Sequence, residues 1–129
     1  MMPMMQISLA PWRILSEKEC AIYQKAVKIH EEHGELFAKL AEKAARTGEP
    51  VLRHMDYEFP GQGFEAVKDQ FMIGSDIMVA PVVTKGCFER TVFFPEGSDW
   101  ISERGEQYEG GTSARVDVPL DRLPLFRRK

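Results

Sequence analysis

The chain of 129 residues is long enough for one ordinary domain or for two smaller units that share a core. It is 43% hydrophobic and 29% charged, and its net charge is −3. An acidic chain with these proportions lacks the basic face that nucleic-acid binding requires. No stretch approaches the roughly 18 consecutive apolar residues of a membrane span. We therefore expect neither nucleic acid nor a membrane among its partners.

The residues that most often bind metals form no recognisable set. Cys20 and Cys87 lie far apart in the sequence, so we expect two free thiols. His30 and His33 have the spacing of a metal pair, but no third ligand accompanies them. The sequence therefore predicts no metal site and no cofactor. The start, MMPMMQISLAPW, lacks the charged region and long apolar core of a signal peptide, and localisation stays open.

The N-terminal part reads mainly as helix. The first 15 residues are apolar, and Trp12 among them favours a packed loop. Ser16 and Glu19 have the spacing of a capping box, which predicts a helix over residues 16–47. Gly34 is expected to kink or break this helix, and Gly48 to end it in a left-handed conformation. Apolar residues recur along it at spacings of three and four: Ile22, Ala26, Ile29, Leu36, Phe37, Leu40 and Ala44.

A strand over about residues 50–58 is predicted next, within the segment 49–60. Its inward face carries Val51, Met55, Tyr57 and Phe59, and Arg53 falls on that same face. An inward arginine must be paired, because a buried unpaired charge is strongly unfavourable. We expect a buried ion pair at Arg53; the alternative is a position that lines an active site. Residues 64–71 are predicted to form a short helix.

The segment 69–86 organises the rest of the chain. It contains the longest apolar run, Ile77 to Val83, whose β-branched content predicts a strand covered on both faces. Pro81 cannot donate a ladder hydrogen bond, so the strand lies at an edge, is bulged or breaks there. After Gly86, turns and short strands alternate, which favours an antiparallel β-sandwich. We expect these strands at residues 88–94, 100–101 and 112–118, with 119–126 closing the fold and Arg127–Lys129 as a solvated tail.

General catalytic motifs are missing from the sequence. It contains neither a Gly-rich phosphate loop nor a G-x-S-x-G elbow. The carboxylates of residues 17–42 fall on the solvated faces of the predicted helix, and Asp69, Asp76 and Asp121 lie beside turns or strand starts. From composition and spacing alone, the chain is an α+β protein with no identified activity.

Several segments, in order, resemble glycoside hydrolase family 31, the α-glucosidase and α-xylosidase family. The best match is DQFMIGSDIMVAPV at residues 69–82, which resembles the family signature DQFxxGxxLLVAPV. The other matching segments are TGEPVLR (47–53), FPEG with Trp100 (94–97 and 100), YEGG (108–111), PLDRLPLF (119–126) and MPMMQ with APWR (2–6 and 10–13).

The resemblance implies that the chain corresponds to the end of a (β/α)8 barrel and the β-sandwich that follows it. Residues 1–68 would be the C-terminal remnant of the barrel, with the long helix outside and residues 50–57 as the eighth strand. Residues 69–129 would be the proximal C-terminal sandwich domain. The family's nucleophile and acid/base segments are not in this sequence, so the resemblance assigns no catalytic residue here. Asp56 and Tyr57 would lie near the active-site rim of the barrel and are the candidates for contact with substrate.

The sequence departs from the family pattern in its first residues. Gln6 and Ser8 stand where many members have an arginine and a sugar-contacting histidine, and His54 replaces the usual proline after Arg53. The departure removes a substrate contact or marks a subgroup with another sugar preference.

Two functions remain open at this point. The first is the C-terminal part of a retaining α-glycosidase acting on α-glucosides or α-xylosides, with a supporting role and no activity alone. In that case the apolar helix stripe and Met-rich start would be uncovered, so we expect self-association, and carbohydrate would be a partner only in the full enzyme. The alternative is a freestanding β-sandwich module that binds carbohydrate or a protein partner through exposed aromatic side chains. Trp100 and Tyr108 are its candidates, although aromatic residues at such positions more often pack in a core.

Overall fold

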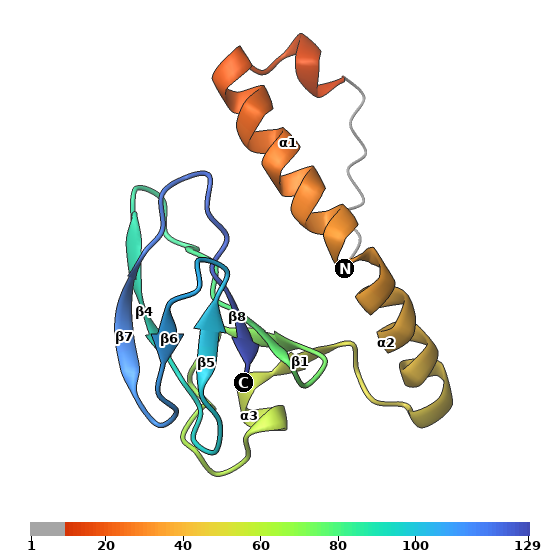
Figure 1. The fold of residues 1–129 in the computed structure, drawn as a ribbon, viewed down its shortest axis with the longest axis vertical. Coiled ribbons are helices and arrows are strands. Elements are labelled where there is room, and N and C mark those ends of the chain that lie inside the picture. Colours follow the sequence, from red (N-terminus) through yellow and green to blue (C-terminus); the bar gives the residue numbers. More distant parts are fainter. Residues whose placement is uncertain (1–9) are drawn as a thin grey trace.

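The computed structural model describes residues 10–129, in which a helical arm precedes two antiparallel sheets (Figure 1). The arm consists of the short 3-10 helix η1 (Pro11–Arg13) and the helices α1 (Glu17–Glu32) and α2 (Gly34–Thr47). The predicted α+β class, with helices before an antiparallel β region, is confirmed.

Local signals in the sequence fix both ends of the arm and its break. The Ser16 backbone N–H donates to Glu19 Oε2 at 2.8 Å, and the Glu19 N–H donates to Ser16 Oγ at 3.4 Å, which completes the predicted capping box. His33, with φ −99° and ψ 1°, separates the two helices immediately before Gly34. Gly48, with φ 77°, ends α2 in the left-handed conformation that glycine adopts without strain. The predicted break and the predicted end of the helix are both confirmed.

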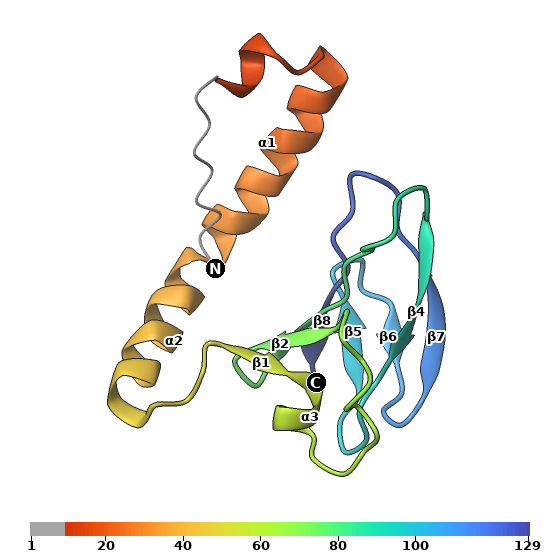
Figure 2. The ribbon, with the colours of Figure 1, turned by 180° about the vertical axis from the view of Figure 1, so that it is seen from behind.

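The described strands form a six-stranded sheet, in the order β1-β2-β3-β8-β5-β6, and a two-stranded sheet, β4-β7 (Figure 2). Their pairings are all antiparallel. Their bounds are β1 (Leu52–His54), β2 (Phe71–Ile73), β3 (Ile77–Val79), β4 (Glu89–Phe93), β5 (Trp100–Ser102), β6 (Gln107–Tyr108), β7 (Ser113–Asp117) and β8 (Leu125–Arg128).

The core lies between the two sheets. Across β2, β3 and β8, the register aligns Met72, Met78 and Phe126 in one row, and none of these side chains is accessible to solvent. Phe94 meets the ring of Phe126 edge to face, with 5.1 Å between centroids. The other buried apolar members of this cluster are Met55, Phe59, Phe64, Ala80, Val92, Trp100, Val116 and Val118. Along residues 114–118, buried Val116 and Val118 alternate with exposed Arg115 and Asp117, as in a strand with one face on the core.

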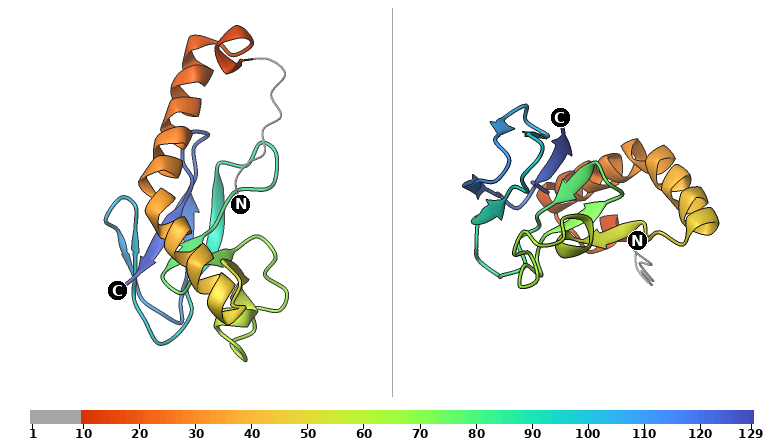
Figure 3. Two further views of the ribbon diagram at one scale, coloured as in Figure 1. Left: turned by 90° about the vertical axis from the view of Figure 1, so that its right-hand side faces the viewer. Right: turned by 90° about the horizontal axis from the view of Figure 1, so that it is seen from below.

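The opposite face of the large sheet is also apolar. Register places Phe71, Val79 and Leu125 in one row there, and a neighbouring row runs through Leu52 and Ile73. The arm stands along this face (Figure 3). The sheet thus turns one face to the core and the other toward the arm, which explains why residues 71–79 do not alternate between polar and apolar.

The arm touches the sheet at one tight point. Gly74 turns the chain between β2 and β3 with φ 60°, and a Cβ built there would lie 2.8 Å from Cδ2 of Leu40 on α2. The glycine thus allows the turn and the close approach of α2 together. β1, from before residue 69, pairs with β2 from after it, and the division of the chain at residue 69 stays a prediction.

The strand predicted over about residues 50–58 is wrong in its second half. Only Leu52–His54 is extended, and Met55–Glu58 forms a helical turn, α3. His54 caps this turn, because its Nδ1 accepts the Asp56 backbone N–H at 3.3 Å. The turn directs Tyr57 outward, so the prediction that it faces inward with Arg53 is also wrong.

Two further predicted elements are shorter than expected. Residues 64–70 form a turn, closed by a hydrogen bond from Val67 N–H to Phe64 O, and not a helix, and Phe71 already belongs to β2. The apolar run forms a strand only as far as Val79. Beyond it, the Ala80 N–H donates to Pro124 O at 3.1 Å, and Pro81 ends the pairing as predicted.

Expectations about both ends of the chain need correction. Trp12 is 75% exposed, so the packed loop is wrong for the part of it that is described, while residues 1–9 lie outside the described residues. Arg127 and Arg128 are not a solvated tail, because both belong to β8 inside the large sheet. The Arg128 guanidinium lies 5.0 Å from the centroid of the Phe59 ring, in cation–π geometry.

Candidate functional site

Arg53 is the centre of a buried ionic cluster at the junction of β1 and α3. Its side chain is 7% exposed, and Nη1 donates to Glu58 Oε2 at 2.6 Å. Nη2 donates to Glu49 Oε2 at 3.0 Å and Nε donates to Pro50 O at 3.1 Å. The hydrogen bond to Glu58 raises the pKa of Arg53 above its already high value, so this cation is permanent. The predicted buried ion pair is confirmed.

The cluster continues from the sheet into the arm. Lys43 on α2 contacts Glu49 at 2.7 Å, and Glu49 in turn contacts Arg53. The hydrogen bond from Lys43 lowers the pKa of Glu49. Lys43, Glu49 and Arg53 thus form a chain of alternating charges that joins α2 to β1 through the linker, residues 48–51, between them.

Asp56 and Tyr57 are both placed on α3, beside this cluster. Asp56 is half-buried, and the Tyr57 side chain is 55% exposed. The Arg53 guanidinium lies 6.0 Å from the centroid of the Tyr57 ring. A carboxylate next to an exposed aromatic ring is chemistry that suits a sugar, but their contact with substrate stays a prediction.

The family-like segment at residues 69–82 has a structural explanation. The Gln70 amide is buried and mimics a strand residue, because its Oε1 accepts the Phe93 N–H at 2.9 Å while its Nε2 donates to Phe93 O at 3.0 Å. Arg90 Nη1 donates to Asp69 O at 2.7 Å and to Pro81 O at 2.5 Å, and its Nη2 contacts the Asp69 carboxylate at 3.0 Å. Asp69, Gln70 and Pro81 are therefore fastened to β4, which belongs to the other sheet.

The two aromatic residues considered for sugar binding pack in the core instead. Trp100 is fully buried, and its Nε1 donates to Pro95 O at 3.4 Å. Tyr108 is half-buried and stacks on Phe94 with 4.5 Å between ring centroids. Burial raises the pKa of Tyr108, and the hydrogen bond that its hydroxyl donates lowers the pKa of Glu106. Trp100 therefore offers no exposed ring to a sugar, and one face of the Tyr108 ring is covered by Phe94.

Gly110 and Gly111, which follow Tyr108, allow another close contact in the sheet region. A Cβ built at Gly110 would lie 2.8 Å from Pro95 O and would also collide with Ser98 O. The turn that contains Pro95 therefore rests directly on the Gly110 backbone. The short motifs shared with the family thus describe contacts between strands and turns.

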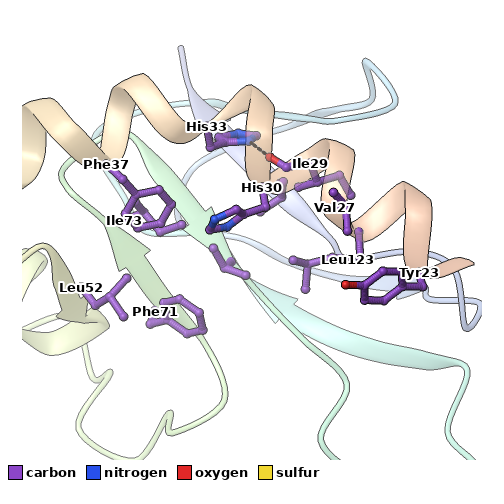
Figure 4. A pocket seen from close by; sticks show the side chains of 13 residues that line it. Tyr23, Val27, Ile29, His30, His33, Phe37, Leu52, Phe71, Ile73 and Leu123 are labelled. Atoms are coloured by element: carbon purple, nitrogen blue, oxygen red, sulfur yellow. Dashed lines mark hydrogen bonds between the residues drawn. The ribbon is translucent and has the colours of Figure 1, made fainter. Parts of the chain in front are cut away.

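An open apolar groove separates the arm from the outer face of the large sheet (Figure 4). It has a volume of about 550 Å³, and among residues 10–129 no acidic, lysine or arginine side chain lines it. The arm contributes residues from both helices, and they face side chains of the sheet across the gap. The lining residues are Tyr23, Ala26, Val27, Ile29, His30, His33 and Phe37 from the arm, and Leu52, Phe71, Ile73, Val79, Leu123 and Leu125 opposite.

The histidines of this groove have structural surroundings. His33 Nδ1 lies 2.7 Å from Ile29 O, and His30 projects among apolar side chains. Within residues 10–129, no three histidine, cysteine or acidic side chains gather as metal ligands would. No helix of that same part of the chain has the length and hydropathy to cross a membrane. Cys20 and Cys87 are free thiols, as predicted.

Sequence reasoning missed two features of this region. The sequence pattern does not identify the partners of Arg53, because Glu58 lies on a helical turn where a strand is expected. The sequence does not reveal the groove, because its two walls come from segments about 15 to 100 residues apart. The signal in the sequence that could indicate the groove is an apolar stripe on the helix together with a strand that is apolar on both faces.

Comparison with known proteins explains the motifs. Residues 48–129 match the family model described as the glycosyl hydrolase family 31 C-terminal domain. The chain belongs to glycoside hydrolase family 31. The motif-bearing segments 69–82 and 94–100 both lie within the matched region.

Relatives of this family 31 chain carry several activities in their names. It is 32% identical over 121 residues to the myogenesis-regulating glycosidase of Mus musculus, covering 93% of this chain and 17% of the relative. It is 30% identical over 118 residues to alpha-glucosidase 2 of Bacillus thermoamyloliquefaciens, covering 90% of this chain and 15% of the relative.

Solved structures of the family include the same arrangement of arm and sheets. An alpha-xylosidase from a soil metagenome, complexed with xylose, superposes with a TM-score of 0.84 at 34% identity, over 88% of this chain and 17% of that one. A Flavobacterium johnsoniae dextranase superposes with a TM-score of 0.82 at 31% identity, over 93% of this chain and 15% of that one. The family 31 chain thus spans about one sixth of the length of such relatives.

Proposed function

We propose that this chain serves as the C-terminal part of a retaining α-glycosidase, and that it supports the catalytic barrel without cleaving substrate itself. The observation that carries the proposal is the apolar groove, in a chain that spans about one sixth of its relatives. Both walls of this groove are apolar, and such a surface requires a covering partner. In the larger enzyme, that partner would be the rest of the barrel.

The chemistry of retaining hydrolysis is consistent with a structural, non-catalytic role for this chain. A retaining glycosidase needs two carboxyl groups about 5–5.5 Å apart across the scissile bond. The nucleophile and acid/base segments of the family are not in this sequence. The acids around Arg53 act as partners of buried or neighbouring cations. Substrates of the whole enzyme would be α-glucosides or α-xylosides, with Asp56 and Tyr57 at the rim of its active site.

A hydrolysis assay tests this proposal directly. The purified chain is incubated with aryl α-glucoside and aryl α-xyloside, and release of the phenol is followed against a buffer blank. We expect no release above the blank. Release that is abolished in the Asp56→Asn or Glu58→Gln variant would show that the chain cleaves glycosides with its own acids, and the proposal would be wrong.

The alternative of a freestanding carbohydrate-binding module makes a different prediction. It requires an exposed aromatic platform, but Trp100 is buried and Tyr108 is stacked on Phe94. Of the exposed aromatic side chains in residues 10–129, Tyr57 is the one that lies beside the Arg53 cluster. A titration with glucose or xylose is therefore expected to leave tryptophan fluorescence unchanged. A saturable change that is lost in the Tyr57→Ala variant would favour the binding module.

A further inference from the structure

The small sheet carries an exposed aromatic side chain on its outer face. Phe93 is the last residue of β4, and it is 42% exposed. Register places it directly opposite Ser113 of β7, so both side chains project from the same face, opposite to that of buried Val92. β4 and β7 lie on the side of the sandwich that faces away from α2 (Figure 1 and Figure 3). The Phe93 ring is therefore accessible from solution.

A hollow of about 320 Å³ lies beside this ring, and polar side chains surround it. We call it the Phe93 hollow. Its polar side chains are those of Gln62, Glu96, Thr112 and Ser113, and no lysine, arginine or histidine of residues 10–129 lines it. Ligand pockets have volumes of about 300–1,000 Å³, so this hollow has room for one small ring.

The polar groups of Gln62 and Glu96 are held in fixed positions. Gln62 Oε1 accepts the Glu96 backbone N–H at 2.9 Å, which leaves the two donors of Gln62 Nε2 for a ligand. The Glu96 side chain lies against Gly111, where a Cβ would come within 2.9 Å of Glu96 Cγ. Because no cation lines the hollow among the described residues, the Glu96 carboxylate can accept hydrogen bonds from a ligand.

The backbone beneath the hollow is equally well fixed. The Gln70 amide binds both the N–H and the C=O of Phe93, at 2.9 and 3.0 Å. The Phe94 N–H donates to Thr112 O at 2.8 Å, and the Gly111 N–H donates to Phe94 O at 2.9 Å. A site whose backbone is already ordered loses little conformational freedom when a ligand binds.

We propose that the Phe93 hollow binds one pyranose ring of a neutral oligosaccharide. The C–H face of the sugar packs on the Phe93 ring, and its hydroxyl groups donate to the Glu96 carboxylate and accept from Gln62 Nε2. Hydrogen bonds to an ionised carboxylate are stronger than neutral ones. The inference goes beyond the proposed supporting role and does not rest on it. It also departs from the expectation that carbohydrate is a partner only in the full enzyme.

A small organic cation is the other ligand that an aromatic ring beside a carboxylate could take. Gln62 argues against it, because a cation without acceptor atoms leaves both donors of Nε2 unused. Sugar hydroxyl groups both donate and accept, so they match the carboxylate and the amide together. The polar groups of the hollow therefore favour a sugar.

Binding is tested by NMR on the ¹⁵N-labelled 129-residue chain, with maltotriose as the probe. A small exposed site is expected to bind with a dissociation constant of about 1 mM or weaker, so the titration extends to about 50 mM. We expect saturable shifts confined to the backbone amides of Phe93, Gly111 and Ser113 and the side-chain amide of Gln62. Sorbitol, which has hydroxyl groups but no ring, is expected to cause no saturable shift. Trp12 and Trp100 do not line the hollow, so tryptophan emission should stay unchanged.

Two variants remove separate parts of the site. Phe93→Ala removes the ring, and Glu96→Gln preserves the size of the side chain but removes its charge. Each is expected to weaken maltotriose binding at least about fivefold. Glu96 is exposed, so this variant keeps the test valid even if Phe93→Ala fails to fold. Phe88→Ala is the matched control, because Phe88 is 60% exposed but does not line the hollow, and it should leave the dissociation constant unchanged.

Four results would overturn the proposal: no saturable shift with maltotriose, equal shifts with sorbitol, shifts that persist in Glu96→Gln but are lost in Tyr57→Ala, or tighter binding of tetramethylammonium than of maltotriose. The hydrolysis assay measures bond cleavage and is independent of all four. Failure of this inference and failure of the proposed function are therefore distinguishable.

Discussion

Arg53 shows how a single buried charge joins separate parts of the chain. Its guanidinium donates to Glu58 on α3 and to Glu49 in the linker, and Glu49 also binds Lys43 on α2. Breaking a buried pair by removing one partner is strongly destabilising, because the other charge stays buried without compensation. An exposed pair contributes far less, since water solvates both ions. The burial of Arg53 therefore determines how much this cluster matters.

Replacing Arg53 tests that statement. Arg53→Met leaves the Glu58 carboxylate, whose side chain is 13% exposed, without its closest partner. We expect the free energy of unfolding, measured by urea denaturation, to fall by about 3 kcal/mol. Arg115→Met is the control, because Arg115 pairs with Glu89 while 73% exposed, and its loss should stay below about 1 kcal/mol. Equal losses in the two variants would contradict a buried role for Arg53.

At the scale of the elements, side-chain hydrogen bonds add to the backbone hydrogen bonds that join the strands. β2 and β3 have three residues each, so each strand contributes few backbone hydrogen bonds. Gln70, just before β2, offers its amide to both backbone groups of Phe93 on β4. The resulting link joins the two sheets at their edge. It explains why a glutamine, and not an apolar residue, occupies a fully buried position here.

The Gln70→Leu variant measures the strength of this link. It preserves the approximate size of the side chain but leaves the Phe93 N–H and C=O without their partner. We expect a loss of about 2 kcal/mol in unfolding free energy and faster hydrogen exchange at the Phe93 amide. Gln62→Leu is the control, because Gln62 accepts the Glu96 N–H at 2.9 Å but is exposed. Unchanged exchange at Phe93 would mean that the Gln70 amide does not hold β4.

In the molecule as a whole, the arm is expected to be less stable than the sheets because it contributes no buried residue. The core lies between the sheets, and α1 and α2 contribute no buried residue to it. An isolated helix of about 16 residues is only marginally stable in water, because most helical stability comes from tertiary packing. The arm should therefore open before the sandwich unfolds.

Hydrogen exchange at a concentration where the chain is monomeric tests this order. We expect amides of α1 to exchange through local opening, with protection well below that of β3 and β8 in the centre of the large sheet. Lys25→Ala, which removes the ion pair with Asp121, is expected to speed exchange in α1 only. Protection in α1 equal to that of β3 would show that arm and sheets unfold as one unit.

The candidate site was partly predictable from sequence. The need of Arg53 for a partner follows from its position on an apolar face, but Glu58 as that partner does not, because α3 replaces the expected strand end. Tyr57 changes from inward to exposed for the same reason. Asp56 and Tyr57 as substrate contacts stay predictions. The groove could not be located, because no local pattern records the distance between the arm and the sheet.

Short segments encode the capping box at Ser16, the helix break before Gly34, the helix end at Gly48 and the motifs that mark family 31, so these follow from the order of residues alone. Each depends on residues a few positions apart, so local sterics and hydrogen bonding are sufficient. Other features come from the folded chain: Arg128 lies over Phe59, Gln70 binds β4 and the arm leaves an apolar groove open. These features depend on strand register and packing between distant segments, which become defined only when the whole chain has folded.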